Sequence, residues 1–446
     1  MAHEVLGDYL AAVGAQIRWR RARRPLLREL SDHIADQAAD FQAQGLEEEA
    51  ALDRAVAEMG DPETVGRDLD RLHRPQNRWG LALGVLFLLL AGLLLQYLSA
   101  RFLQDSEADY YFRRQGFGAL LSAGVLAGLW FSDCTLLLRR RWAAGAALGL
   151  TAAVCLAAWM ALPWLRARSL VTYLTLLTPV PYAALLYRLR GRGGGTVLLS
   201  GLGALALAAV GLSSAASGAV AAGTMLLTLG AAVGLGWFAV GRGRGLLLAW
   251  GPALALAGLL LLQCPGLLDR LTVFLHPERD PMGAGYLYLG LREGTLLSPF
   301  FSDNACDYFL AFLAQMLGRW VFPFAAALLA LAALLLLRRV RRLRSRSGKL
   351  LALSALLPLL LQGVLYLLFN LGYSPLGPLS LPFLSFGAAY LLTNSLLAGF
   401  LLSVFRMDAL LRDGPDQALP SPFPNRLDLR LPLGRGSLSI RYRRSS

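Results

Sequence analysis

Charged residues are scarce in this chain, and lysine is almost missing. Only 16% of the 446 residues are charged, and Lys349 is the single lysine among 43 basic residues. A soluble protein of this length needs more polar surface than such a composition supplies. The net charge of +14 comes almost wholly from arginines beside hydrophobic runs. We therefore interpret it as a signal of membrane topology and expect no binding of nucleic acid.

Cysteine and histidine are also rare, with four of each. Their spacing matches no zinc site. Cys134 and Cys155 fall inside hydrophobic runs, where a thiol acts as a small apolar side chain. Cys264 and Cys306 flank a long polar stretch and could be bridged. The chain opens with a charged helical segment, so the sequence predicts no cleavable signal peptide.

Long hydrophobic runs dominate what remains. Apolar residues make up 56% of the chain, and the mean hydropathy is +0.51. Ten runs of about 20 residues recur, each long enough to cross about 30 Å of hydrocarbon as a helix. They cover residues 80–98, 117–138, 143–165, 169–187, 196–212, 216–240, 246–263, 309–337, 350–370 and 383–405. The sequence thus predicts an all-α, polytopic membrane protein with ten transmembrane helices, spanning residues 78–406.

Arginines in alternate loops predict the orientation. They gather at 139–141, 188–192, 242–244 and 338–349, whereas the intervening loops mix basic residues with acids such as Asp105, Glu107 and Asp109. Because positively charged loops stay in the cytoplasm, an even number of spans places both termini there. The long loop 264–307 is then extracytoplasmic.

Residues 1–77 form a separate segment. Apolar residues recur at helical spacing, and Gly45 and Gly60-Asp61-Pro62 mark breaks. With 15 acidic and 10 basic residues, we expect a small cytoplasmic bundle of three or four helices. The segment resembles the prefix domain of various permease-like proteins in Gram-positive bacteria. That resemblance implies regulation or partner contact, and simple anchoring is the alternative.

The tail, residues 407–446, is polar and contains four closely spaced prolines. They are Pro415, Pro420, Pro422 and Pro424. We expect a loosely ordered cytoplasmic extension.

The long loop carries acids and bases together, most of them expected to be solvated. They are Asp269, Arg270, His276, Glu278, Arg279, Asp280, Arg292, Glu293 and Asp303. Asp307 differs by position, because Asp303 or Asn304 can cap the next helix and place Asp307 in its first turns. A carboxylate there is either functional or simply favourable to the helix dipole.

A second group of residues precedes the tenth run. Pro382 and Gly387 are five residues apart at its start, which predicts a distorted entry into the helix. Irregular backbone at membrane depth is tolerated only where it is buried in protein or lines a cavity. Gln362 and Asn370 are two turns apart, so both could face such a cavity or bond to other helices.

Two stretches carry a family resemblance. Residues 381–406 read LPFLSFGAAYLLTNSLLAGFLLSVFR and residues 306–318 read CDYFLAFLAQMLG. The first resembles the last span of the SEDS family, the FtsW, RodA and SpoVE group of cell-shape and division proteins. The second resembles the family stretch after its large outer loop, where an Asp-Phe pair precedes two glutamates and a Leu-Gly.

The resemblance implies a glycosyltransferase of the bacterial cytoplasmic membrane. SEDS proteins polymerise lipid II into glycan strands at the outer face, together with a class B penicillin-binding protein. It implies that Asp307 is the base, and that Arg292 and Arg279, or a divalent cation such as Mg or Mn, face the diphosphate. The residues expected to line the substrate groove are Gln362, Asn370, Pro382, Ser385 and Gly387.

The chain also departs from the family pattern. Gln315 and Met316 occupy the positions of the two glutamates, and Phe386 that of a tyrosine. Two alternatives therefore stay open. One is transport of a lipid-linked precursor, for which Asp133 is a candidate intramembrane acid. The other is a non-catalytic scaffold or sensor of the same family.

Overall fold

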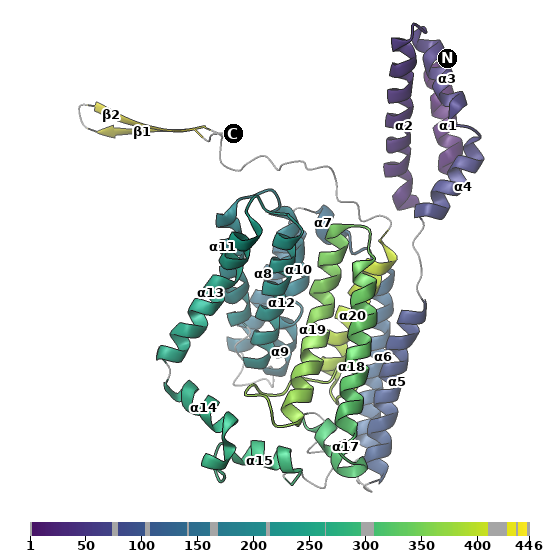
Figure 1. Ribbon diagram of the computed structural model, residues 1–446. Coiled ribbons are helices and arrows are strands. Elements are labelled where there is room, and N and C mark those ends of the chain that lie inside the picture. The colour runs from purple at the N-terminus through teal and green to yellow at the C-terminus, as the bar shows by residue number, and fades with distance from the viewer. Residues whose placement is uncertain are drawn as a thin grey trace.

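The computed structural model describes most of the chain. It covers residues 2–73, 79–102, 108–140, 142–160, 168–210, 215–263, 265–295, 307–408, 426–433 and 436–443. Its membrane part is all-helical, as predicted, and a small helical bundle and a polar tail leave it at the same end (Figure 1).

The N-terminal segment forms a bundle with its own apolar core. Its helices are α1 (Ala2–Gln16), α2 (Arg20–Ala43), α3 (Glu48–Glu58) and α4 (Pro62–His73). Gly45 and Gly60 have φ values of 94° and 83°, so the two predicted breaks lie where the backbone turns left-handed. A Cβ at Gly66 would lie 2.8 Å from the carbonyl oxygen of Val13, so α4 packs closely on α1.

The membrane part is a sequence of helices joined mostly by short links. They are α5 (Trp79–Phe102), α6 (Ala108–Phe131), α7 (Leu136–Arg139), α8 (Ala143–Met160), α9 (Arg168–Thr175), α10 (Pro179–Arg188), α11 (Gly194–Val210), α12 (Ala215–Gly234), α13 (Arg242–Gln263), α14 (Pro265–Leu275), η1 (Pro277–Arg279), α15 (Tyr286–Glu293), α17 (Phe309–Leu317), α18 (Val321–Arg341), α19 (Arg346–Asn370) and α20 (Ala388–Arg406). The described part of the predicted long loop, residues 265–295, is thus largely helical, and α14, α15 and α17 lie at the end opposite the termini (Figure 1).

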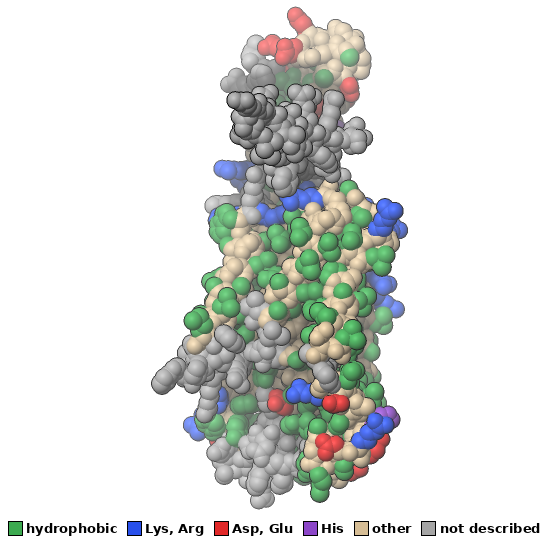
Figure 2. Space-filling model, turned by 90° about the vertical axis from the view of Figure 1, so that its left-hand side faces the viewer, with side chains coloured by type: hydrophobic (Ala, Val, Ile, Leu, Met, Phe, Trp, Pro, Cys, Tyr) green, Lys and Arg blue, Asp and Glu red, His purple; other side chains and the backbone are tan. Residues whose placement is uncertain are grey.

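Length and hydropathy make this part a multi-pass membrane protein. Among the described residues, six helices are long and apolar enough to cross a bilayer, namely α5, α12, α13, α18, α19 and α20, and two shorter apolar segments lie in α8 and α11. Hydrophobic side chains cover the middle of the face in Figure 2, and charged ones gather toward its two ends. The number of ten spans remains a prediction.

Burial separates central from peripheral helices. In the apolar stretches of α12, α19 and α20, 61–67% of residues are buried, against 11% in α13 and α18. Side chains such as Leu247 and Leu254 of α13 are exposed on the protein surface. Because lipid is as apolar as leucine, such a surface is stable in a bilayer.

Some predicted runs differ from the helices of the structure for a visible reason. Residues 169–187 divide into α9 and α10, because Pro179 begins a new helix and offers no N–H to the preceding turn. Residues 309–337 divide at Gly318, which has a φ of 101°. The last helix begins at Ala388 rather than near residue 383, after the distorted entry that the sequence predicted.

The prediction of an irregular tail is wrong for two segments. β1 (Arg426–Leu433) and β2 (Gly436–Arg443) pair antiparallel, with Leu429 opposite Ile440. Leucines alternate with polar residues along β1, and this period of two is typical of a strand. The four prolines that suggested disorder, Pro415, Pro420, Pro422 and Pro424, all precede the strands.

Candidate functional site

The start of α17 is held by side chains from a distant helix. The first backbone N–H groups of a helix have no partner within it. The N–H of Phe309 donates to the Tyr366 hydroxyl at 3.0 Å, and that of Ala311 donates to Asn370 Oδ1 at 2.9 Å. Tyr366 and Asn370 are four residues apart on α19 and therefore share one of its faces. They cap α17 from across the fold.

Asn370 also fixes the backbone of Asp307. Its amide nitrogen donates to the carbonyl oxygens of Asp307, at 3.1 Å, and of Tyr366, at 3.0 Å. Asn370 is completely buried and uses three hydrogen-bonding positions. Asp307 thus lies in a tight turn just before α17, not within its first turns as predicted. Asp303 and Asn304, the predicted caps, lie outside the described residues.

Asp307 lies at a boundary between buried and exposed groups. It is half-buried, as is Tyr308, the residue before α17. Burial, with a smaller contribution from the negative charge of Asp307, raises the pKa of the Tyr308 hydroxyl. The carboxylate therefore has a neutral phenol as its chain neighbour at ordinary pH.

Arg292 joins the long-loop helices to the end of α19. Its Nε donates to the carbonyl oxygen of Gly372 at 3.1 Å, and an Nη donates to that of Phe274 at 2.9 Å. Its guanidinium also lies 4.6 Å from the centre of the Tyr373 ring. Arg292 therefore holds α14 and α15 next to the segment that follows Asn370. Arg279 is exposed on η1.

The distorted entry to α20 is partly buried and is held by glutamines. Phe383 has a φ of 67°, rare for a residue with a side chain, and Gly387 has a φ of 130°. Gln115 of α6 accepts a hydrogen bond from the Gly387 N–H at 2.9 Å and donates to the Ser385 carbonyl at 3.3 Å. Gln96 of α5 donates to the Leu384 carbonyl. Backbone groups left by the irregular chain thus find side-chain partners.

Gln362 belongs to a second network. It accepts a hydrogen bond from the Ser380 hydroxyl at 3.3 Å and donates to Asn394 Oδ1 at 3.2 Å. All three residues are buried. Gln362 thus links α19 to α20 and to the segment before it. This is the helix-to-helix alternative considered for the two amides, and Asn370 also bonds to protein groups.

The structure brings some predicted site residues together and separates others. Asn370 contacts Asp307. Arg292 donates a hydrogen bond to Gly372, which lies two positions after the end of α19. Ser385 and Gly387 share Gln115, and the half-buried Pro382 lies in the same segment. Gln362 and Arg279 have their own, separate surroundings.

Sequence reasoning missed four residues that build this region. They are Gln96, Gln115, Tyr366 and Asn394. Gln96 and Asn394 are amides inside apolar stretches, and their polarity in such surroundings was a usable signal, whereas Gln115 follows two arginines outside the predicted run. Tyr366 gave none, because a tyrosine in an apolar run is commonly a packing residue.

The described residues offer no metal site. Nowhere in this part of the chain do three His, Cys, Asp or Glu side chains lie close enough to hold a metal ion. Cys264 and Cys306 lie outside the described residues, while Cys134 and Cys155 are buried thiols.

Comparison with curated proteins identifies relatives with one shared description. The chain is similar to proteins described as probable peptidoglycan glycosyltransferase FtsW. The Trichlorobacter lovleyi protein is 27% identical over 154 residues, or 31% of this chain and 40% of that protein. Those of Thioalkalivibrio sp. and Idiomarina loihiensis are 29% identical over 31% and 33% of this chain, and 38% and 40% of their own lengths. This chain matches about two fifths of the length of these relatives.

A solved structure shares the fold. It comes from a study of how a peptidoglycan synthase complex coordinates polymerization and crosslinking. The TM-score is 0.52 at 21% identity, with 74% of this chain and 98% of the solved chain covered. The model of the family FTSW_RODA_SPOVE, described as cell cycle protein, matches residues 188–409, which include Asp307, Asn370 and the α20 entry. The chain therefore belongs to the FtsW, RodA and SpoVE family of cell cycle proteins.

Proposed function

We propose that this protein is a peptidoglycan glycosyltransferase that polymerises lipid II at the outer face of the cytoplasmic membrane. Asp307 acts as the base, and a class B penicillin-binding protein is the partner. The family and the description of the curated relatives support the reaction class. The observation that carries the proposal is the pair of hydrogen bonds by which Asn370 holds the Ala311 N–H and the Asp307 carbonyl.

The chemistry needs one base and little else. The acceptor hydroxyl oxygen attacks the anomeric carbon of the donor, the bond to the lipid diphosphate breaks, and the hydroxyl proton passes to Asp307. The diphosphate is already a stable anion and needs no proton to leave. A single displacement of this kind inverts the anomeric centre. General-base catalysis of this type contributes about 10²–10⁴-fold.

Fixed backbone geometry suits this role. Proton transfer requires the carboxylate to be within hydrogen-bonding reach of the hydroxyl, and a rigid anchor maintains that position. Asn370 and Tyr366 lie on one of the most buried helices, α19. Anchoring Asp307 to α19 therefore ties it to the centre of the fold rather than to a surface loop.

Positive charge for the diphosphate would come from Arg292. Two of its five N–H donors bind backbone carbonyls, which leaves others for an anion. Arg319, whose Nη donates to the Arg292 carbonyl at 2.8 Å, adds a second cation beside it. Pro382, Ser385 and Gly387 would form the wall of the groove next to α6, and Gln362 would stiffen that wall from α19. Arg279 would meet the substrate from the exposed η1.

The orientation follows from the distribution of charge. Arg338, Arg342 and Lys349 lie at the end from which both termini leave, and positively charged ends face the cytoplasm. On this basis both termini are cytoplasmic, and Asp307 faces the outside, where the glycan is made.

The decisive experiment is polymerisation of purified lipid II by the purified full chain, with and without the candidate penicillin-binding protein. Asp307→Asn is expected to lower the rate by about 10²–10⁴-fold while the melting temperature stays unchanged. Glu293→Gln, which neutralises an exposed carboxylate on α15, is the matched control and should retain full activity. Full activity of Asp307→Asn would remove Asp307 from the catalytic role.

A scaffold is the second candidate. The positions of the family glutamates are occupied by Gln315, which is exposed, and by Met316, so no carboxylate follows Asp307 within α17. A scaffold would form a stable complex with the penicillin-binding protein but yield no polymer in the same assay. Movement of labelled lipid II across vesicles without polymer would instead indicate transport.

A further inference from the structure

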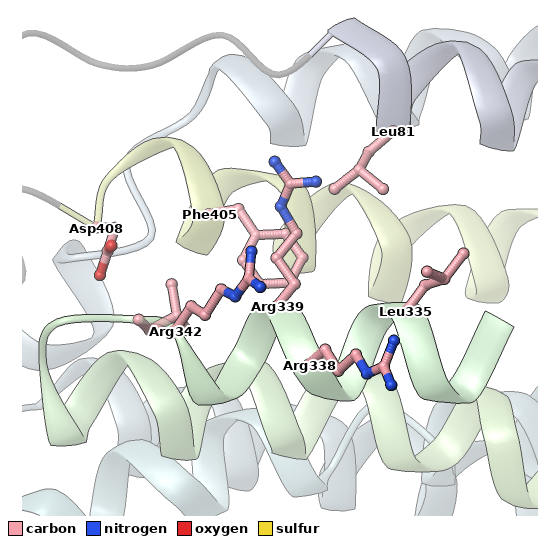
Figure 3. A pocket seen from close by; sticks show the side chains of 8 residues that line it. Leu81, Leu335, Arg338, Arg339, Arg342, Phe405 and Asp408 are labelled. Carbon is pink, nitrogen blue, oxygen red and sulfur yellow. The ribbon is translucent and has the colours of Figure 1, made fainter. Parts of the chain in front are cut away.

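A cavity opens at the end of the membrane domain where both termini leave it. It has a volume of about 580 Å³ and is lined by residues of α5, α18 and α20 and of the segments that follow α18 and α20. Figure 3 shows the side chains of Arg338 and Arg339 on α18, and of Arg342 just after it, along this space. The Arg339 guanidinium reaches toward Leu81 of α5 and lies 6.0 Å from the centre of the Phe405 ring. We call this the arginine pocket.

Helical spacing brings the three arginines to one face. Arg338 and Arg342 are four residues apart, and Arg339 and Arg342 are three apart, so all three project from neighbouring turns. Leu335 lies one turn earlier on the same face and is 55% exposed. The face is therefore cationic at the end of the helix and apolar one turn deeper in the membrane.

The described residues that line the arginine pocket carry more basic than acidic side chains. Asp408 is the one acid among the described residues that line it. One of its carboxylate oxygens accepts the backbone N–H of Arg344 at 2.9 Å. Among the described residues that line the cavity, three guanidinium groups thus accompany a single carboxylate. A bound anion would restore the balance, and guanidinium groups match the geometry of phosphate oxygens.

We propose that the arginine pocket binds the phosphate headgroup of an anionic membrane lipid. The lipid belongs to the leaflet at the end where the termini lie. Its phosphate sits between Arg338, Arg339 and Arg342, and its acyl chains run along Leu335 and the rest of α18. Basic pockets between transmembrane helices are suited to such headgroups.

Features around the pocket favour a lipid over a soluble phosphate. Only 11% of the apolar stretch of α18 and 22% of that of α5 are buried, so both helices present apolar surface to the bilayer. Leu81 and Leu335 line the pocket on these helices. A ligand with a phosphate at one end and hydrocarbon at the other satisfies both parts of the lining, whereas a free anion satisfies only the arginines.

The test measures lipid retention by the full chain in detergent, using native mass spectrometry. The probes are phosphatidylglycerol and phosphatidylcholine, with glycerol phosphate as a soluble competitor. The double variant R338Q/R342Q is expected to bind phosphatidylglycerol about twentyfold more weakly. Each basic residue near an anionic lipid surface strengthens binding by a factor of about four to five. The matched control, R341Q/R344Q, removes the same charge from exposed residues at the end of the same helix but outside the pocket, and its binding should stay unchanged.

Several results would overturn the proposal. Equal losses in both double variants would mean that a diffuse basic surface attracts the lipid. Displacement of phosphatidylglycerol by an equal concentration of glycerol phosphate would mean that the pocket takes a free anion. Equal retention of phosphatidylcholine would exclude selection for negative charge.

A variant that is expected to strengthen binding distinguishes the proposal from misfolding, because a misfolded protein would bind more weakly. Asp408→Asn removes the carboxylate from the pocket and keeps an oxygen that can accept the Arg344 N–H. It should strengthen binding of phosphatidylglycerol severalfold, and the gain should vanish when R338Q/R342Q is added. Weaker binding by Asp408→Asn would contradict the proposal.

Discussion

The first N–H groups of α4 and of α17 are paired with hydrogen-bond acceptors of different kinds. At α4, in the N-terminal bundle, Asp61 accepts the N–H and the hydroxyl of Thr64 at 2.9 and 2.6 Å. At α17, next to Asp307, the N–H groups are accepted by Tyr366 and Asn370, more than 50 residues away along the chain. One cap is local and exposed, and the other is remote and buried.

The difference shows what each cap can control. A local cap stabilises its own helix and nothing else, because both partners move together. A remote cap ties two helices, so it determines where the start of α17 lies relative to α19. For a residue such as Asp307, whose proposed work depends on position, the remote cap is the more consequential arrangement. The following variants test that comparison in order of expected effect.

Asn370→Ala should have the largest effect. It removes three hydrogen bonds and leaves the Ala311 N–H buried without its acceptor. The free energy of unfolding should fall by about 2 kcal/mol, and polymerisation should fall with it. The measurements are thermal unfolding in detergent and the lipid II assay.

The matched control is Asn394→Ala, which removes another buried amide that bonds to α19 but not to α17. It should lower stability without a comparable loss of activity per folded molecule. If both variants lose activity equally, the position of α17 does not depend on the remote cap.

Tyr366→Phe should have a smaller effect of the same kind. It keeps the aromatic ring in the core and removes only the hydroxyl that accepts the Phe309 N–H. We expect a loss of about 1 kcal/mol in the free energy of unfolding. Tyr373→Phe, at an exposed tyrosine just beyond α19, is the control. A similar shift in both would show that the hydroxyl of Tyr366 makes no net contribution.

The smallest expected effect is the contribution of Asp61 to the pH dependence of stability. Its hydrogen bonds to Thr64 lower the pKa of the Asp61 carboxyl below its ordinary value of 3.8. A lowered pKa in the folded state means that this stabilisation is fully present above the unfolded pKa and is lost as the pH falls through the folded one. A carboxylate titration of the full chain by NMR should show the lowered pKa.

The control for Asp61 removes its partner. Thr64→Ala should bring the pKa of Asp61 back toward 3.8, because the side-chain hydrogen bond is the largest cause of the shift. An unchanged pKa of Asp61 in Thr64→Ala would show that the hydrogen bond to the Thr64 side chain does not cause the lowered pKa. The lipid II activity should be unaffected, since α4 lies in the N-terminal bundle.

Much of the fold could be predicted where the signal is local. Hydropathy predicted an all-α polytopic protein, and glycines at 45 and 60 predicted breaks that have positive φ in the structure. The Pro382 and Gly387 pair predicted the distorted entry to α20. The tail was misjudged because its prolines drew attention away from the alternating leucines of β1.

The partners of the polar side chains could not be predicted in the same way. Asn370 and Gln362 share a spacing that suggested a common cavity, yet they bond to different segments. The pairing of Gln115 with Gly387 joins residues 272 positions apart. No periodicity encodes such a distance.

The sequence by itself determined that the chain crosses a membrane, which of its stretches are apolar helices, and that an aspartate precedes α17. Each of these depends on local properties of the chain. They are the free energy of moving apolar side chains out of water and the hydrogen bonds between backbone groups that are close in sequence. Only the tertiary structure decided that α19 caps α17 and that glutamines of α5 and α6 hold the entry to α20. The physical reason is that a buried N–H or carbonyl group needs a hydrogen-bond partner, and the packing of helices decides which group lies within about 3 Å of it.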